Sequence, residues 1–134
     1  MSTEEEILKS SRTIAVVGLS ASAERKSHEV AAYLKEQGYR IIPVNPGETH
    51  ILGEVSYPDL VSIPEHVDVV DIFRRSGEVV PVVIEAIRSG IKAVWMQEGV
   101  INEEAATQAR RAGLTVVMDR CMMKEHRKLN NKGY

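Results

Sequence analysis

The sequence contains a single cysteine, Cys121, and this scarcity limits the chemistry open to the chain. One cysteine excludes an intramolecular disulfide and a cysteine-rich zinc site, and it fits a reducing compartment. The four histidines, His28, His50, His66 and His126, lack the i, i+4 spacing of a helical metal site. We therefore expect no metal centre.

Long apolar runs and an excess of one charge are also absent. No segment approaches the roughly 18 apolar residues of a membrane span, and the acidic N-terminus has no apolar core of signal-peptide length. The 134 residues carry a formal net charge of −2, whereas nucleic acids and anionic membranes require a basic surface. We expect a cytoplasmic protein that binds neither nucleic acid nor membrane, so any anion site must be local.

Apolar, β-branched runs alternate with helical patterns along the chain. Strands are expected over residues 13–18, 39–46, 67–73, 91–96 and 114–119, and helices over residues 3–11, 27–38, 77–90 and 102–113. Residues 47–66, marked by proline and glycine, leave room for a short strand near Ile51 or Val55, and a basic tail closes the chain. The alternation predicts one domain over residues 1–134 with a Rossmann-like, doubly wound α/β fold. With the short strand near Ile51 or Val55 counted as the third and residues 67–73 as the fourth, the parallel sheet should hold about five strands in the order 3-2-1-4-5, with room for one more, and helices on both faces.

The loop after the first strand lacks the glycines of a dinucleotide-binding fingerprint. That fingerprint is G-x-G-x-x-G, followed by an acidic residue at the end of the second strand. Here Gly18 is followed by Leu19 and Ser20, the next glycine is Gly38, and Asn45 stands where the acid is expected. NAD in its usual pose would therefore lack its two main supports.

In place of glycines, the loop offers hydroxyl groups and cations. They are Ser20, Ser22, Ser27, Arg25 and Lys26, and the loop after residues 67–73 adds Arg74 and Arg75. The carboxyl ends of the two preceding strands meet at one edge of a doubly wound sheet, so these charges can converge on one crevice and suit a polyanion. The alternative is that the cations only solvate exposed loops.

Three segments of the chain resemble one known family. They are VVGLSASAERKSHEVAAYLKEQGYRIIPVNP, VDIFRRSGEVVPVVIEAI and AVWMQEGVINEEAATQARRAGLTVVMDRCMMKEH, and they span nearly the whole chain. The family is that of the small bacterial and archaeal CoA-binding proteins, whose fold is similar to the CoA-binding N-terminal domain of the succinyl-CoA synthetase α subunit. One departure lies in the first loop, where family members commonly carry prolines around the arginine and this chain has Ala23 and Glu24.

The resemblance implies that coenzyme A or an acyl-CoA binds in the crevice at the carboxyl ends of the strands. The residues implied at the phosphates are Gly18, Leu19, Ser20, Ser22, Arg25 and Lys26. Those implied around the nucleoside are Val44, Asn45, Pro46, Phe73, Arg74 and Val79, and those beside the pantetheine arm are Met96, Gln97, Gly99 and Asn102. The thiol of Cys121 is a further candidate for contact with the ligand, through a mixed disulfide.

The residues and the resemblance favour a non-catalytic role as a carrier, sensor or thiol-protecting partner of CoA. No catalytic set of residues can be placed at the strand edge, and the phosphohistidine domain of the related synthetases is absent from these residues. Two alternatives stay open. The chain is a component of an acyl-CoA synthetase or ligase that acts with a separate partner subunit, or it is an NAD(P)-binding or ligand-free interaction module.

Overall fold

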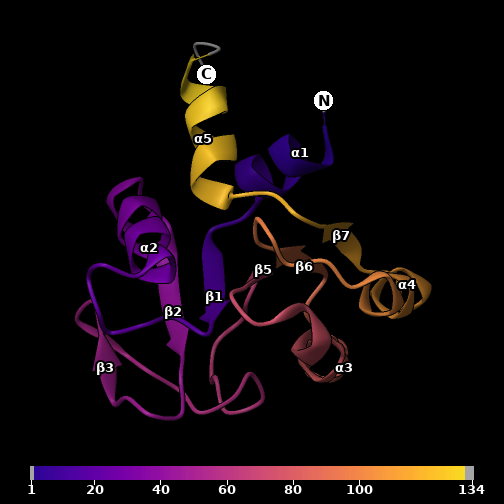
Figure 1. Cartoon of the computed structure of the whole chain (residues 1–134), viewed down its shortest axis with the longest axis horizontal. Helices are drawn as coiled ribbons and strands as arrows, with labels where there is room; N and C mark the ends of the chain where they lie inside the picture. Colours follow the sequence, from indigo (N-terminus) through magenta and orange to yellow (C-terminus); the bar gives the residue numbers. More distant parts are fainter. Residues whose placement is uncertain (1, 132–134) are drawn as a thin grey trace.

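The computed structural model describes residues 2–131, within which five parallel strands form one sheet between helices (Figure 1). In chain order the elements are α1 (Thr3–Ser10), β1 (Thr13–Val17), α2 (Lys26–Glu36), β2 (Arg40–Val44), β3 (His50–Ile51), β4 (Glu54–Val55), β5 (Val69–Ile72), the 3-10 turn η1 (Ser76–Glu78), α3 (Val79–Arg88), β6 (Ala93–Met96), α4 (Glu103–Arg111), β7 (Thr115–Val117) and α5 (Met122–Asn131). The sheet order is β2-β1-β5-β6-β7, which confirms the doubly wound α/β fold. The chain changes its direction of winding between β1 and β5, and folds of this type bind ligands at that point.

The short strand expected near Ile51 takes a different place from the one predicted. Residues of β3 and β4 pair only with each other, as an antiparallel ribbon, and do not join the main sheet. Beyond β2 the sheet continues only as a single bridge between Val44 and Tyr57. Pro43 accepts a hydrogen bond from the Tyr57 N–H at this outer edge but has no N–H to give in return. The outer edge of β2 is therefore poorly suited to pair with a further strand, and β2 is the edge strand of the main sheet.

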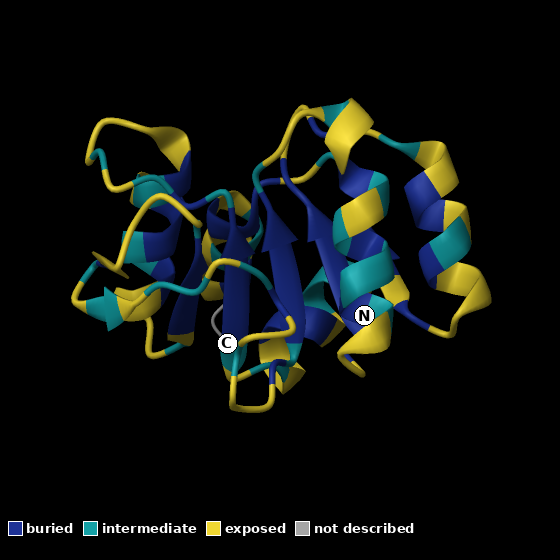
Figure 2. Ribbon diagram, turned by 90° about the horizontal axis from the view of Figure 1, so that it is seen from below, coloured by how far each residue is buried: buried dark blue, intermediate teal, exposed yellow. Residues whose placement is uncertain are grey.

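Two apolar clusters cover the two faces of the sheet. On one face, α3 and α4 pack against residues such as Val70 and Ile72, and on the other, α1, α2 and α5 pack against residues such as Val16 and Trp95. Figure 2 shows the strands of the main sheet buried along almost their whole length, while the helices turn their exposed sides outward. Both faces of the β-branched strands are thus removed from water, as the absence of an apolar–polar alternation in them predicts.

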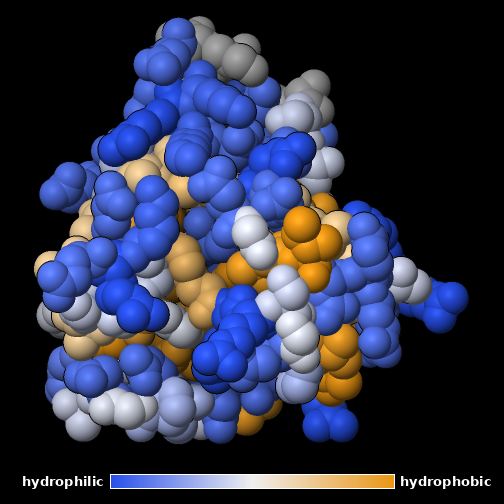
Figure 3. Space-filling model, in the orientation of Figure 1, coloured by the Kyte–Doolittle hydropathy of each residue, from blue (hydrophilic) through white to orange (hydrophobic). Residues whose placement is uncertain are grey.

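The last element, α5, was expected only as a basic tail. Met122, Met123 and Leu129 are buried against the α1 and α2 side of the sheet, but the charged residues between them hide this apolar face in the sequence. Elsewhere the surface is mainly hydrophilic on the face drawn in Figure 3, with hydrophobic side chains toward its middle. No helix within residues 2–131 is long and apolar enough to cross a membrane.

Gly18 ends β1 at the point where three strands meet. Its N–H donates to the Val44 carbonyl at the end of β2, and the Phe73 N–H donates to the carbonyl of Val17. Gly18 has a φ of +85°, and a Cβ placed on it would overlap the Phe73 carbonyl oxygen. Glycine is therefore required here for two reasons, its backbone conformation and the close approach of the neighbouring chain.

Replacing Gly18 by alanine should lower the free energy of unfolding by about 2–4 kcal/mol, because a methyl group at positive φ would also collide with a fixed backbone oxygen. Gly90→Ala is the matched control, since Gly90 has a φ of +75° and open space beside it. It should cost only about 1–2 kcal/mol. Urea denaturation of the two variants measures the difference, and equal losses would show that the contact with Phe73 adds nothing.

Asp71 is a buried carboxyl in the middle of the sheet, between Val16 of β1 and Trp95 of β6. Neither of its oxygens has a hydrogen-bond partner within residues 2–131. Burial raises the pKa of Asp71 well above its ordinary value, because water no longer solvates the charged form. The folded protein therefore holds this carboxyl in its neutral form at pH values where the unfolded chain ionises it.

The stability linked to the neutral carboxyl should be fully present below the unfolded pKa of 3.8 and lost as the pH rises through the raised folded pKa. Within that window the free energy of unfolding should fall by about 1.4 kcal/mol per pH unit. Asp71→Asn removes the titration, so the difference between wild type and variant isolates this group. Urea denaturation at a series of pH values measures it. Parallel pH dependences of the two proteins would contradict the prediction.

Candidate functional site

A cavity of about 650 Å³ opens at the carboxyl ends of β1, β2, β5 and β6. Its lining residues are Gly18, Ser20, Arg25, Lys26, Val44, Asn45, Pro46, Phe73, Arg74, Arg75, Glu78, Gln97, Glu98 and Val100. They come from the loops that leave the sheet on either side of the switch point. The size is within the range of clefts that hold drug-sized ligands or cofactors, roughly 300–1,000 Å³.

Serine side chains fix the loop between β1 and α2. The Ser20 N–H donates to Oγ of Ser27 at 3.0 Å, and the Ser22 N–H donates to Oγ of Ser20 at 3.0 Å. The Ser22 hydroxyl donates to Oε1 of Glu24 at 2.9 Å. The Ser22 hydroxyl is thus engaged within the loop, and Oγ of Ser27, which lies in the first turn of α2, accepts from the loop backbone. Of the three serines, Ser20 lines the cavity and keeps its hydroxyl proton available.

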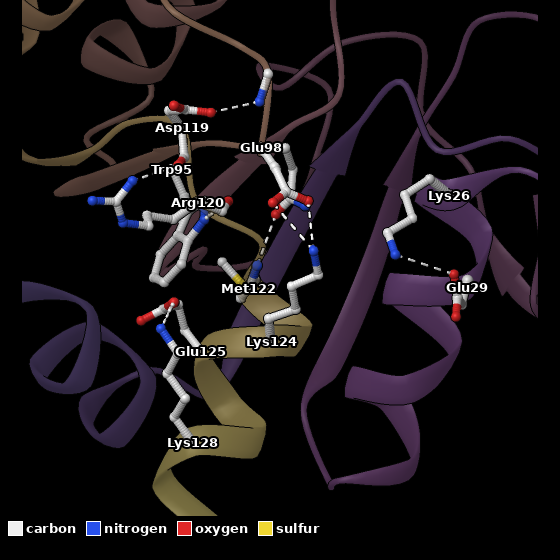
Figure 4. Close-up of polar contacts among 12 residues, drawn as sticks. Lys26, Glu29, Trp95, Glu98, Asp119, Arg120, Met122, Lys124, Glu125 and Lys128 are labelled. Carbon is white, nitrogen blue, oxygen red and sulfur yellow. Dashed lines mark hydrogen bonds and ion pairs between the residues drawn. The ribbon is translucent and has the colours of Figure 1, made fainter.

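Positive charge gathers beside this loop. Arg25 occupies the N-cap position of α2, makes no capping hydrogen bond through its side chain, and lines the cavity together with Lys26, the first residue of the helix. Lys26 forms an exposed ion pair with Glu29 at 3.4 Å (Figure 4). Arg25, Arg74 and Arg75 form no salt bridge with any residue in 2–131. These charges are therefore free to bind an anion.

Asn45 joins the two loops at the β2 end of the cavity. Its Nδ2 donates to the Leu19 carbonyl at 3.0 Å, and its Oδ1 accepts from the Gly47 N–H at 2.8 Å. Both ends of the amide are therefore used inside the protein. Asn45 thus lines the cavity and connects the loop after β2 to the loop after β1, and it adds no charge to this wall.

The first turn of α5 holds the loop after β6, which forms the β6 end of the cavity (Figure 4). Oε1 of Gln97 accepts from the Met122 N–H at 3.0 Å. Nζ of Lys124 lies 2.9 Å from Oε1 of Glu98, and the pKa of Lys124 is raised by that carboxylate. This wall thus presents an amide and a carboxylate whose positions are set by the start of α5.

Most of the residues expected to bind a cofactor lie around this cavity. They are Gly18, Ser20, Arg25, Lys26, Val44, Asn45, Pro46, Phe73, Arg74 and Gln97. Six others do not line it, namely Leu19, Ser22, Val79, Met96, Gly99 and Asn102. Leu19, Val79 and Met96 are buried in the apolar clusters, while Asn102 caps α4 and donates to the Ser76 carbonyl at 2.8 Å.

Besides Arg75, which was named above as a cation of this edge, the cavity is lined by Glu78, Glu98 and Val100, which are not among the residues expected to bind the ligand. Glu78 belongs to η1, which was expected as part of the following helix, and Glu98 and Val100 belong to the loop after β6. Cys121 is 2% exposed, belongs to the cluster under α1, α2 and α5, and does not line the cavity. The structure therefore does not bring its thiol to the site.

This geometry has close counterparts among known proteins. The uncharacterized protein YneT of Bacillus subtilis is 40% identical over 122 residues, which make up 91% of this chain and 90% of that protein. The structure of a hypothetical protein from Pyrococcus horikoshii OT3 matches with a TM-score of 0.93 at 40% identity, covering 97% of this chain and 93% of that one.

A larger enzyme subunit is also similar. The ADP-forming acetate–CoA ligase II subunit alpha of Pyrococcus furiosus is 30% identical across 89% of this chain, but the match spans only 29% of that subunit. The family model described as the CoA binding domain matches residues 12–127, which include every strand of the main sheet and every loop around the cavity. The chain belongs to this family of CoA-binding domains.

Proposed function

We propose that the cavity binds coenzyme A or an acyl-CoA, and that the chain acts as a non-catalytic carrier, sensor or thiol-protecting partner of this ligand. The observation that carries the proposal is the distribution of charge along the sheet edge. Arg25, Arg74 and Arg75, which form no salt bridge within residues 2–131, line the middle of the cavity at the ends of β1 and β5, where Lys26 and Glu78 join them and positive charge predominates. The β2 end is neutral, and the β6 end is an amide beside a carboxylate. A ligand with phosphates between two less charged parts fits this order.

The preference for CoA over NAD is supported by Asn45. A carboxylate at this position would bind the ribose hydroxyls of NAD, whereas the amide is neutral and has both ends engaged within the protein. CoA carries a pyrophosphate and a 3′-phosphate, so it gains more than NAD from several nearby cations. Arginine binds phosphate through paired, charge-assisted hydrogen bonds, which suits Arg25, Arg74 and Arg75.

The non-catalytic role is supported by how the polar side chains of the site are used. Asn45 and Glu98 are engaged with other protein groups, and the oxygen of Gln97 is held by a backbone N–H. None of these groups is activated by a neighbouring base in the way a nucleophile requires. The side chains are arranged to hold a ligand in place.

A second candidate function is supported by the similarity to the ligase subunit of Pyrococcus furiosus. In this alternative, the chain supplies the CoA site of a ligase whose remaining domains reside in a separate subunit. Native mass spectrometry of the protein isolated from its own cells distinguishes the candidates. A complex with CoA alone supports the carrier or sensor role, and a stoichiometric larger protein subunit supports the ligase role.

Titration calorimetry with CoA, 3′-dephospho-CoA and NAD tests the ligand. Because charge-assisted hydrogen bonds contribute about 1.5–3 kcal/mol each, removal of the 3′-phosphate should weaken binding by at least about tenfold. NAD should bind more weakly than CoA as well. Equal affinities for CoA and NAD would overturn the assignment.

The same titration with Arg25→Glu locates the phosphates. The charge reversal should weaken CoA binding by at least about tenfold and reduce its salt dependence, because it removes a phosphate contact and adds a repulsive charge. Arg110→Glu, in the last turn of α4 and exposed, is the matched control and should bind CoA as the wild type does. If both variants bind equally well, Arg25 does not contact the ligand.

A further inference from the structure

Asp71 lies beneath the cavity, in the middle strand of the main sheet. Its register partners are Val16 of β1 and Trp95 of β6. Two residues further along these three strands the chain reaches the cavity and forms its floor, at Gly18, Phe73 and Gln97. A strand advances by about 3.3 Å per residue, so Asp71 lies about 7 Å below this floor.

The carboxyl group of Asp71 lacks a stabilising partner. The residue is 0% exposed, and neither oxygen forms a hydrogen bond with any residue in 2–131. Its side chain shares the face covered by α1, α2 and α5 with Val69, two residues earlier in β5. The neighbouring indole N–H, Nε1 of Trp95, donates to the Arg120 carbonyl instead. Buried polar groups are nearly always paired, so this carboxyl is tolerated there only in its neutral form.

The titratable groups that surround Asp71 lie on both sides of it. Those on the covering elements that are half-buried or buried are Glu4, Glu5, His28, Tyr33, Tyr39, Cys121, Glu125 and His126, and the other charged side chains of α1, α2 and α5 are exposed. The charged residues that line the cavity above are Arg25, Lys26, Arg74, Arg75, Glu78 and Glu98. The pKa of Asp71 is raised by burial, and no charge contributes to the shift. Access of water therefore controls its ionisation.

Ionisation of Asp71 and binding of an anion in the cavity oppose each other for a geometric reason. Water can reach the carboxyl only when the elements packed around it separate. Two of the strands beside it end at Gly18 and Phe73, whose backbones touch, so a shift of β1 against β5 changes the floor of the cavity. A carboxylate about 7 Å below the floor would also repel a bound phosphate. Both effects favour the neutral carboxyl while an anion is bound.

We infer that Asp71 makes the cavity sensitive to pH: the neutral carboxyl supports anion binding, and its ionised form opposes binding without touching the ligand. The inference rests on the proposed function, because it concerns the regulation of the same site. Coupling between two binding events is reciprocal, so an occupied cavity raises the pKa of Asp71 further. Where the free protein holds Asp71 ionised, each molecule of ligand bound is accompanied by the uptake of one proton from solvent.

Calorimetric titration with CoA from weakly acidic to alkaline pH tests the inference. The CoA affinity of the wild type should fall by up to about tenfold per pH unit as Asp71 ionises, because one proton is linked to binding. Asp71→Asn and Asp71→Val cannot ionise and should lack this decrease, and valine suits a buried strand should the amide fold poorly. Glu36→Gln removes an exposed carboxyl at the end of α2 and should follow the wild type. The ionisation of CoA itself contributes equally to all four proteins.

Infrared difference spectra provide a second measurement. At alkaline pH, addition of CoA should increase the C=O band of a protonated carboxyl in the wild type and not in Asp71→Asn. A pH-dependent decrease in affinity that is lost in the Asp71 variants and kept in Glu36→Gln supports the inference. Parallel pH profiles for the wild type and both Asp71 variants overturn it while the proposed function stands. A wild type that binds no CoA at any pH overturns the proposed function itself.

Discussion

The contact between Gly18 and the Phe73 carbonyl determines the shape of the site. Because Gly18 has no side chain, the chain can turn at the end of β1 while the end of β5 lies directly against it. The Gly18 N–H also donates a hydrogen bond to the Val44 carbonyl, so the carboxyl ends of β2, β1 and β5 lie side by side at one edge of the sheet. The loops that follow these three strands therefore begin at the same edge of the sheet and surround one cavity. Arg25 and Arg74, which are distant in the sequence, border the same cavity for this reason.

The loop between β1 and α2 carries serines where dinucleotide-binding loops carry glycines. Successive glycines let the backbone approach a pyrophosphate closely. Here Ser20 and Ser27 accept hydrogen bonds from the loop backbone and hold it in one conformation. Oε1 of Glu24 accepts a hydrogen bond from the Ser22 hydroxyl, which ties this carboxylate to the loop. The loop is thus fixed by serine side chains, and it brings the cations Arg25 and Lys26 to the cavity.

Much of the fold follows from the sequence alone, because alternation of apolar runs and helical patterns is a local signal. The outer edge of β2 could not be predicted, since it depends on how Tyr57 meets Pro43 after a long loop. The loops that carry the site were also foreseeable. The sequence does not show which polar atoms of these loops stay without a protein partner. The atoms that do have partners find them far along the chain, as Gln97 does in Met122.

The balance of donors and acceptors explains what the site can select. The acceptor atoms of Asn45 and Gln97 are occupied by backbone N–H groups, whereas the Ser20 hydroxyl, the arginines and the Gln97 amide nitrogen keep donors available. The acceptors that remain include the carboxylates of Glu78 and Glu98, and Lys124 neutralises the latter. A cavity of this kind favours ligands rich in oxygen acceptors. CoA supplies them along its whole length, as phosphate oxygens in the middle and carbonyl oxygens on the arm, so its complete length can be matched by donors already in place.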